Sequence, residues 1–185
     1  MNFIAIDFET AYYSKNSACA IGMVKYLNGK KADTFYSLIR PPRLYIRPNF
    51  TAIHGLTVED VKDAPVFSEI WKDKILPFIS NLPLAAHNAQ FDINVLCSVL
   101  EYYEQVIPDF SYFCTCNLAR KCWSELKSHK LTLLAENFGI KYNAHNALDD
   151  AETCGKIALL AAEKYKATCV DDLLDIVDIK LKERS

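Results

Sequence analysis

The chain has 185 residues, of which 51% are hydrophobic and 24% are charged, and its formal net charge is −2. This length can bury one sizeable core, and no Gly-, Pro- or Ser-rich stretch divides the chain, so we expect a single domain over residues 1–185. The weak negative charge argues against a protein that grips long duplexes, because such binding depends on many lysine and arginine contacts to phosphate. An enzyme that holds only a strand end is not excluded, since bound divalent cations reverse the charge of an acidic site.

The apolar run at the N-terminus has no basic segment before it, and no stretch has the length of a membrane span. We therefore expect a soluble, cytoplasmic protein without a membrane partner. Seven cysteines, an odd number without a CxxC pair, favour reduced core residues over a disulfide framework or a zinc site. Cys114 and Cys116 alternate in an expected strand, where packing is favoured over ligation. We assign the cysteines no chemistry.

The first third of the chain predicts an antiparallel β-meander. We expect strands over residues 2–9, 17–26 and 32–40. An Asn-Gly pair at positions 28 and 29 is the strongest short hairpin signal and joins the second and third strands. In the first strand a period of two places Asp7 and Glu9 on the same side. Two carboxylates should therefore project together from its end.

Loops and short helices are expected next. Residues 41–50 are interrupted by prolines and predict a loop. Apolar residues at helical spacing over 67–79 predict a helix that Pro77 kinks or shortens, which gives two short helices. An apolar run over 82–86 predicts a strand that leads directly into a helix with Asp92 in its first turn.

Strands and helices alternate in the second half. We expect a strand over residues 109–115 and helices over residues 116–126, 130–138, 147–165 and 170–184. The last of these helices has an apolar stripe, acidic residues at its start and basic residues at its end. Packing on its own domain is favoured for it over a partner contact. A meander followed by alternating elements implies an α/β fold with a mixed sheet of about five strands flanked by helices.

Four carboxylates and one histidine stand at the ends of these elements. Asp7 and Glu9 end the first strand, Asp92 begins a helix, and His145 and Asp150 flank the start of the 147–165 helix. Carboxylate oxygens are the ligands that Mg²⁺ and Mn²⁺ prefer, and two such ions can support phosphodiester hydrolysis. A histidine of near-neutral pKa can accept the proton of the attacking water. Each residue alone could be a solvated side chain or a helix cap, but together they predict nuclease chemistry.

Three segments resemble the exonuclease motifs of the DEDDh, or DnaQ-like, 3′-to-5′ exonucleases. They are Asp7-Phe8-Glu9-Thr10, His87-Asn88-Ala89-Gln90-Phe91-Asp92 and His145-Asn146-Ala147-Leu148-Asp149-Asp150-Ala151. The five-residue step from His145 to Asp150 matches the histidine subtype of that family. Residues 53–57 resemble a segment of the proofreading epsilon subunits of bacterial replicative DNA polymerases. The resemblance extends over about residues 2–165.

The resemblance implies a ribonuclease H-like fold and two divalent metal ions, Mg²⁺ or Mn²⁺. Asp7 would bridge both ions, Glu9 and Asp150 would complete one site, and Asp92 would support the other, partly through water. His145 would be the general base. Within the third motif, Asp149 is an alternative to Asp150, since adjacent helix positions cannot both face the ions. Tyr142 is an alternative base, because a sister subtype uses tyrosine, although its spacing does not fit.

The same resemblance implies a second set of residues around the terminal nucleotide. These candidate substrate-binding residues are Thr10, Ile53, His54, His87 and Phe91. Ordinary packing or hydrogen bonding explains each of them equally well, because a nucleotide pocket is itself largely apolar. Tyr12 and Tyr13 stand where many relatives have glycine, and they either stack on a base or pack in the loop.

These residues predict a metal-dependent 3′-to-5′ exonuclease that releases 5′-mononucleotides from single-stranded or frayed DNA. An RNA exonuclease of the oligoribonuclease or ribonuclease T type is one alternative, and a non-catalytic nucleic-acid-binding module on the same fold is another. The expected partners are single-stranded DNA 3′ ends, with RNA as the alternative substrate. A DNA polymerase is a candidate protein partner. The sequence indicates no oligomeric state.

Overall fold

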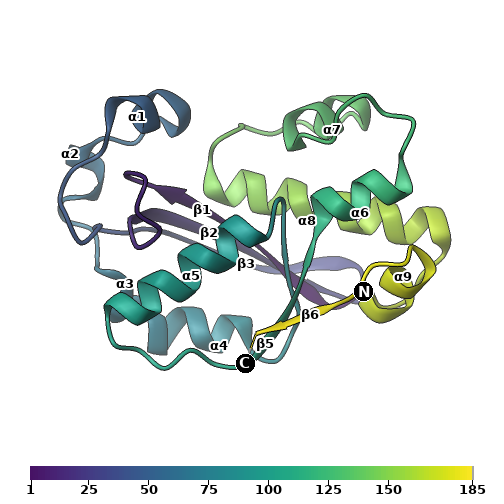
Figure 1. Ribbon diagram of the computed structural model, residues 1–185, viewed down its shortest axis with the longest axis horizontal. Coiled ribbons are helices and arrows are strands. Elements are labelled where there is room, and N and C mark those ends of the chain that lie inside the picture. The colour runs from purple at the N-terminus through teal and green to yellow at the C-terminus, as the bar shows by residue number, and fades with distance from the viewer. Residues whose placement is uncertain (185) are drawn as a thin grey trace.

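A computed structural model describes residues 1–184. It contains a mixed sheet of six strands in the order β3-β2-β1-β4-β5-β6 (Figure 1). The strands are β1 (Phe3–Thr10), β2 (Ala18–Leu27), β3 (Lys30–Leu38), β4 (Leu84–Ala86), β5 (Phe110–Cys114) and β6 (Lys182–Arg184). β1 pairs antiparallel with β2 and parallel with β4, so the meander continues directly into the parallel part of the sheet. The expected α/β fold is confirmed, with one strand more than predicted.

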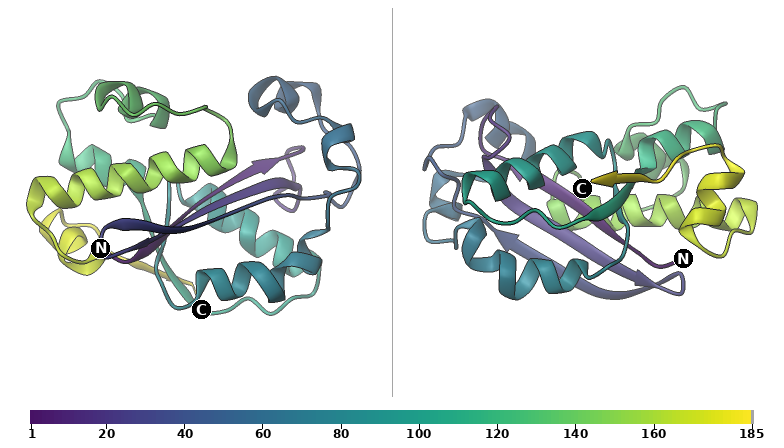
Figure 2. Two further views of the ribbon diagram at one scale, coloured as in Figure 1. Left: turned by 180° about the vertical axis from the view of Figure 1, so that it is seen from behind. Right: turned by 60° about the horizontal axis from the view of Figure 1, so that its bottom comes forward.

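Helices lie on both faces of this sheet (Figure 2). They are α1 (Pro48–His54), α2 (Val58–Val61), α3 (Phe67–Ile70), the π-helical η1 (Trp71–Ile75), α4 (Leu76–Ile79), α5 (Gln90–Tyr102), α6 (Thr115–Cys122), α7 (Leu131–Asn137), α8 (Ala147–Tyr165) and α9 (Val170–Ile176). One core lies between the sheet and α3–α5, and the other lies between the sheet and α6, α8 and α9. Within residues 1–184, no helix combines the length and the apolar character that crossing a bilayer requires.

Alternation along β1 divides its side chains between the two cores. Ile4 and Ile6 are buried toward α3–α5, whereas Phe3 and Ala5 are buried toward α8. The predicted hairpin is also present. Asn28 and Gly29 both have positive φ, 53° and 74°, as a two-residue turn matched to the twist of the strands requires.

Two local predictions need correction. The predicted loop over residues 41–50 ends early, because α1 begins at Pro48, where a helix does not need the missing proline N–H. The helix predicted over residues 67–79 is interrupted as expected, but the interruption lies before Pro77. The π-helical η1 separates α3 from α4, and Pro77 then lies in the first turn of α4, where its lack of an N–H is tolerated.

The predicted terminal helix over residues 170–184 is wrong. The helix α9 ends at Ile176, and Asp178 has a left-handed φ of 54°. The N–H of Ile179 then donates to the Leu174 carbonyl (2.9 Å), a bond that closes a helix end. The chain continues into β6, which pairs antiparallel with β5 and so satisfies the open edge of the sheet. The apolar stripe does pack on its own domain, since Val170, Leu173 and Leu174 are buried.

The cysteine prediction holds with one exception. All seven are free thiols, five of them are buried, and Cys114 is partly buried. Cys169 is exposed, because it caps α9, and its Sγ accepts a hydrogen bond from the Asp172 N–H (3.4 Å).

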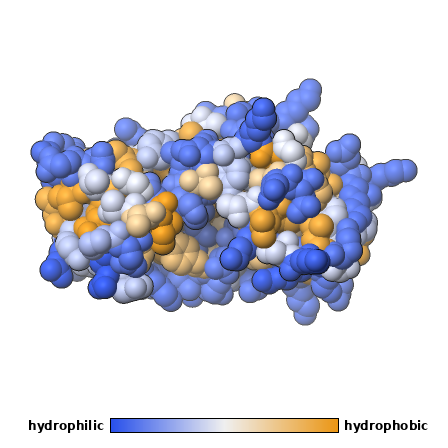
Figure 3. Space-filling model, turned by 90° about the horizontal axis from the view of Figure 1, so that it is seen from above, coloured by the Kyte–Doolittle hydropathy of each residue, from blue (hydrophilic) through white to orange (hydrophobic). Residues whose placement is uncertain are grey.

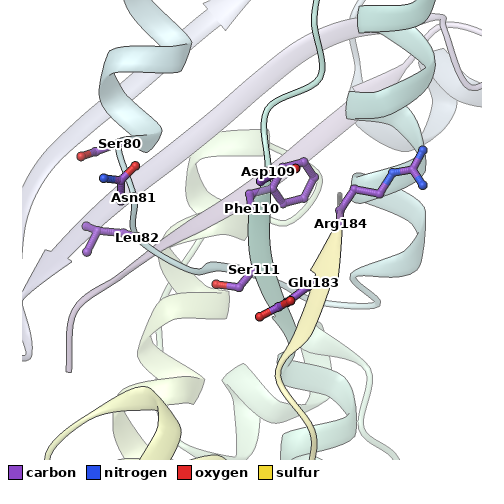
Figure 4. Close-up of a pocket in the computed structure, with 8 residues that line it drawn as sticks. All are labelled: Ser80, Asn81, Leu82, Asp109, Phe110, Ser111, Glu183 and Arg184. Carbon is purple, nitrogen blue, oxygen red and sulfur yellow. The ribbon is translucent and has the colours of Figure 1, made fainter.

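One cavity of about 330 Å³ lies at the end of the sheet where β4 and β5 begin (Figure 4). It is lined by Ser80, Asn81, Leu82, Asp109, Phe110, Ser111, Glu183 and Arg184. The candidate catalytic carboxylates lie at the other end, where β1 ends and α5 and α8 begin. This cavity is therefore separate from the candidate catalytic carboxylates.

Candidate active site

Three of the predicted metal ligands meet at one point. Asp7, Glu9 and Asp150 place carboxylate oxygens within 4.8 Å of one another. Asp7 and Glu9 follow Phe3 and Ala5 onto the α8 face of β1, and Asp150 projects from the first turn of α8. No ion pair within residues 1–184 neutralises any of the three. Negative charge is therefore concentrated here without a protein counter-charge.

A glycine lets α8 come close enough to bring Asp150 to the strand. Gly22 of β2 lies directly opposite Asp7 in the antiparallel register. A Cβ at Gly22 would overlap the backbone of Ala147, the first residue of α8. The start of that helix is further fixed by Asn146, whose Oδ1 accepts hydrogen bonds from the N–H groups of Leu148 and Asp149, each at 3.2 Å. Sequence reasoning missed Gly22, although a glycine within a buried strand is a known sign of close backbone approach.

Asp92 reaches the same strand from the opposite core. Ile4 donates its N–H to the Pro83 carbonyl beside β4 (3.0 Å), but β4 ends before it can serve Phe8 on the same edge of β1. The Phe8 N–H donates instead to Oδ1 of Asp92 (3.1 Å) from α5. The side chain of Asp92 is 2% exposed. The end of β4 therefore creates the position that the Asp92 carboxylate occupies.

Burial raises the pKa of all four carboxyl groups, and the negative charge of nearby carboxylates raises it further. For Asp7 the pKa lies well above its ordinary value, through burial first and then the negative charges of Asp92, Asp150 and Glu9. Burial, followed by neighbouring carboxylates, raises the pKa of Glu9 and of Asp92 to about 8 each. The pKa of Asp150 is raised only to about 6, since the neighbouring His145 favours its charged form. A bound cation would reverse these shifts, because it would supply the missing positive charge.

His145 lies at the mouth of this cluster. Its backbone N–H donates to Oδ2 of Asp150 (2.9 Å), and its φ of 65° is left-handed. The imidazole is exposed. A hollow of about 430 Å³ joins it to the carboxylates, and Figure 3 looks onto this end of the molecule. The hollow is lined by Asp7, His87, Lys130, Leu131, Thr132, Tyr142, His145 and Asp150. Lys130 and Thr132 were not predicted, since a lysine and a threonine before a helix carry no distinctive signal.

The two alternatives within the third motif differ clearly in geometry. Asp149 turns toward the preceding loop, where its Oδ2 accepts a hydrogen bond from the Asn143 N–H (3.2 Å). The carboxylate cluster contains Asp150. Tyr142 does line the hollow, but burial and the nearby Asp150 and Asp7 raise its pKa to about 12. The phenol therefore stays protonated at neutral pH, and it is suited to donate a hydrogen bond.

Ile53 and Phe91 are open to solvent. Ile53 on α1 is 52% exposed, and Phe91 on α5 is 43% exposed. Packing in the core therefore does not explain either side chain. His54 from α1 and Thr10 from β1 lie together, since His54 Nε2 lies 3.2 Å from the Thr10 carbonyl. A carbonyl only accepts, so Nε2 carries the proton, and Nδ1 accepts from the Leu56 N–H (3.1 Å).

His87 lines the hollow, but both its ring nitrogens are engaged. Nε2 lies 2.8 Å from the His129 carbonyl, to which it must donate, and Nδ1 lies 3.0 Å from the Thr115 hydroxyl. Burial lowers the pKa of His87, which favours the neutral ring that this pattern needs. Neither ring nitrogen of His87 is therefore free to hydrogen-bond a ligand. Its hydrogen bonds fix the loop before α7.

The two tyrosines after β1 have different surroundings. Tyr12 is partly buried, and its hydroxyl accepts a hydrogen bond from the Arg43 N–H (3.3 Å). Tyr13 is 73% exposed, and it packs against the Phe50 ring with the Arg47 guanidinium 4.8 Å from its centre. Packing therefore explains Tyr12, while Tyr13 stays available at the surface.

Comparison with known proteins gives the class of this protein. The RNase_T exonuclease family model matches residues 4–158. The chain is 33% identical over 175 residues to DNA polymerase III subunit epsilon of Buchnera aphidicola subsp. Schizaphis graminum, covering 85% of this chain and 72% of that protein. The chain therefore belongs to this exonuclease family, and the resemblance to DnaQ-like exonucleases is confirmed.

Two further comparisons define the extent of the likeness. DNA polymerase III PolC-type of Caldanaerobacter subterraneus subsp. tengcongensis is 30% identical over 183 residues, which cover 97% of this chain but only 13% of the polymerase. Among solved structures, Exonuclease X in complex with 5′ overhanging duplex DNA has a TM-score of 0.73 at 23% identity, covering 95% of this chain and 99% of the other. The fold is thus the ribonuclease H-like fold of the DEDDh exonucleases.

Proposed function

We propose that this chain is a metal-dependent 3′-to-5′ exonuclease that releases 5′-mononucleotides from single-stranded or frayed DNA. One observation carries the proposal: three carboxylates converge within 4.8 Å without a protein cation, and a fourth is buried beside them. Such a cluster is costly for the fold unless cations neutralise it. A module that only binds nucleic acid has no chemical need for it.

The donor set fits divalent metal ions. All four side chains offer hard oxygen ligands, which suit Mg²⁺ and Mn²⁺. We assign Asp7 to both of two ions, Glu9 and Asp150 to one of them, and Asp92 to the support of the other. When bound, the ions would activate a water molecule and stabilise the negative charge that develops at the scissile phosphate.

The protein groups around the cluster have separate roles in this proposal. The His145 imidazole accepts the proton of the attacking water, because it is exposed at the mouth of the hollow while its backbone N–H is fixed to Asp150. The Tyr142 hydroxyl, protonated at neutral pH, donates a hydrogen bond into the hollow. Ile53 and Phe91 contact the terminal nucleoside through their exposed apolar surfaces, and the Thr10 and His54 pair shapes the pocket between them.

The preference for DNA rests on the relatives. The two sequence relatives described above are named DNA polymerase III PolC-type and DNA polymerase III subunit epsilon, and a DNA polymerase remains the candidate partner. RNA is the competing substrate, and a direct comparison decides between the two. The protein should be incubated with 5′-labelled and 3′-labelled single strands of DNA and of RNA with the same base sequence, in Mg²⁺, Mn²⁺ or EDTA.

The expected result is stepwise shortening of the 5′-labelled DNA and immediate release of a labelled mononucleotide from the 3′-labelled DNA. EDTA and Asp7→Ala should each abolish both, whereas Asp149→Ala, one position from the cluster, should retain activity. Faster shortening of RNA would move the proposal to an RNA exonuclease. No shortening of either strand in Mg²⁺ or Mn²⁺ would contradict the proposed function.

A further inference from the structure

A second pocket, of about 470 Å³, adjoins the active-site hollow and shares His87 and Lys130 with it. Its lining is His87, Asn88, Cys116, Arg120, Lys127, Ser128, His129 and Lys130. This lining includes three permanently positive side chains and no carboxylate. We call this the basic pocket. On a chain with a formal net charge of −2, such a concentration of positive charge requires an explanation.

The positive groups of the basic pocket are available to a ligand. Lys127 and Lys130 are exposed and take part in no ion pair within the part of the chain that the structure describes. Arg120 donates only to the side-chain oxygen of Asn117 (2.9 Å), which leaves most of its guanidinium donors free. A structural role would have consumed these charges in contacts with acidic residues.

The loop that carries the lysines is held in place. The His129 carbonyl accepts hydrogen bonds from His87 Nε2 (2.8 Å) and from the Cys116 thiol (3.6 Å). The ring of His129 in turn bonds to the Trp123 carbonyl (2.9 Å). The pocket is therefore organised before any ligand binds, and its hydrogen bonds tie it to the end of β4 beside the active site.

The position of the pocket indicates what it binds, if the proposed function holds. The exposed apolar candidates for the terminal nucleoside, Ile53 and Phe91, lie on α1 and α5 on one side of the carboxylates. The basic pocket is lined by residues that follow β4, by α6 and by the loop before α7. Figure 1 shows α6 and α7 on the other side of the molecule from α1. The scissile phosphate joins the terminal nucleoside to the rest of the strand. If the terminal nucleoside sits against α1 and α5, a path toward α6 and α7 brings the upstream phosphates onto the positive side chains of the basic pocket.

We propose that the basic pocket binds the phosphate groups of the single strand immediately 5′ to the scissile phosphate. Arg120 and Lys127 contact these phosphates, while Lys130, at the boundary of the two pockets, bridges toward the scissile one. This assignment rests on the proposed function. It makes the enzyme sensitive to substrate length, because a substrate without upstream phosphates gains nothing from the pocket.

The double variant Arg120→Gln, Lys127→Gln tests this proposal, since it leaves out Lys130 and every residue of the carboxylate cluster. The matched control is Lys72→Gln, Lys74→Gln, which removes two exposed charges from η1 on the other face of the sheet. Two substrates are compared for each protein. One is a ten-nucleotide strand, and the other is a dinucleotide with a 5′ hydroxyl, whose only phosphate is the scissile one.

Binding is measured separately from turnover. The affinity of each variant for the ten-nucleotide strand is determined by fluorescence anisotropy in a His145→Ala background, in which the strand survives. Competition by inorganic phosphate and by a 5′-mononucleotide is measured in parallel. We expect Kd for the strand to rise by roughly tenfold in the double variant, with a slope of log Kd against log salt that is smaller by about 1.4, or about 0.7 for each lost contact. Hydrolysis of the dinucleotide should be unchanged.

Three results would overturn the proposal. They are unchanged strand affinity in the double variant, an equal loss in the control, and an equal loss of dinucleotide hydrolysis. Competition by a free mononucleotide that the double variant abolishes would also contradict it, because the pocket would then be a product site. If no protein hydrolyses either substrate but the double variant still loses strand affinity, the proposed function fails, and with it the placement beside a scissile phosphate. The basic pocket would then be a binding site for single strands only.

Discussion

The two sides of the active-site cleft are built from opposite kinds of side chain. On the side of α1 and α5, Ile53 and Phe91 expose apolar surface, and the nearby His54 has both ring nitrogens engaged. On the side of α6 and α7, the basic pocket presents Arg120, Lys127 and Lys130 without an acidic neighbour in its lining. The carboxylates lie between them. An apolar side suits a base and sugar, and a cationic side suits phosphates.

This contrast separates recognition from chemistry. An apolar surface distinguishes a nucleoside from water but carries little information about strand length. A row of positive charges responds to the number of phosphates and to salt. Variants on the apolar side should therefore weaken the binding of every substrate, and variants in the basic pocket should weaken only that of longer strands. Variants at the carboxylates or at His145 should slow the hydrolysis of every substrate. The following predictions use that difference, beginning with the middle of the cleft.

The largest effect is expected for His145→Ala. Loss of the proposed general base should lower kcat by roughly 10² to 10⁴. Because His145 lies between the two sides, the loss should be the same for the dinucleotide and for the ten-nucleotide strand. Steady-state kinetics on both substrates, together with calorimetric titration of Mn²⁺, measure the effect. Metal affinity should survive.

Tyr142→Phe is the matched control for that variant, because it removes a hydroxyl from the same hollow and keeps the ring. We expect at most a tenfold fall in kcat for a lost hydrogen bond. A larger fall for Tyr142→Phe than for His145→Ala would transfer the role of the base to the tyrosine. Loss of metal binding in His145→Ala would assign the imidazole a structural or ligating role.

The next effect is expected at Gly22, which sets the distance between the strands and α8. In Gly22→Ala the new methyl group meets the Ala147 backbone, so α8 must shift and carry Asp150 with it. Such overpacking destabilises a fold by about 1–3 kcal/mol, and a misplacement of about 1 Å can lower a rate by about 10². Melting temperature and kcat are both measured.

Gly139→Ala is a control that separates the loss of stability from the misplacement of Asp150. Gly139 has a left-handed φ of 66° with open space around it, so alanine strains the backbone there without touching α8. It should lower the melting temperature and leave kcat unchanged. If Gly22→Ala behaves like Gly139→Ala, the close contact of α8 with β2 matters for stability and has no part in aligning Asp150.

Local periodicity was sufficient to predict most elements on which the site depends. The period of two in β1 places Asp7 and Glu9 on one face, and α8 has the predicted bounds, Ala147–Tyr165. The hairpin at Asn28 and Gly29 follows from their tolerance of positive φ. These features are encoded within a few neighbouring residues, and a single sequence is enough to find them.

Long-range features could not be predicted from the sequence. The strand β6 forms because β5 offers an open edge, and nothing in Lys182–Arg184 itself favours a strand. The hydrogen bond that holds His87 in place depends on the His129 carbonyl, 42 residues away. The basic pocket likewise combines Arg120 from α6 with the Lys127–Lys130 loop, and their shared location is a property of tertiary structure.

A smaller effect is expected on the apolar side of the cleft. Ile53→Ala should raise KM about tenfold for the dinucleotide and for the ten-nucleotide strand alike, since both present the same terminal nucleoside. Val106→Ala, at an 84% exposed valine outside the lining of the cleft, is the control for trimming a surface side chain. A loss confined to the longer strand would place Ile53 on the path of the upstream nucleotides and remove the contrast between the two sides.

The smallest effect is expected on the thermal stability of the metal-free protein, which depends on the carboxylates between the two sides of the cleft. Glu9 and Asp92 have their pKa raised to about 8, so the folded protein retains protons that the unfolded chain releases near pH 4. With more protons bound in the folded state, its stability must fall as pH rises between about 4 and 8. Asp7→Asn removes a buried carboxyl group whose raised pKa costs the folded state stability as the pH rises, so it should raise the melting temperature at pH 8 by about 5 °C, with little change at pH 4.

In saturating Mn²⁺ at pH 8, the wild-type protein should instead have a higher melting temperature than Asp7→Asn. The wild-type protein gains stability from the ion, whereas Asp7→Asn binds it weakly and gains little. Asp149→Asn, whose carboxylate faces the Asn143 N–H outside the cluster, is the control for loss of a negative charge and should respond to Mn²⁺ like the wild type. Melting curves at pH 4, 6 and 8, with EDTA or Mn²⁺, measure both effects. A wild-type melting temperature that rises with pH in EDTA would mean that burial and repulsion do not raise the pKa of these carboxyl groups. The middle of the cleft would then lack the buried, crowded carboxylates that distinguish it from both sides.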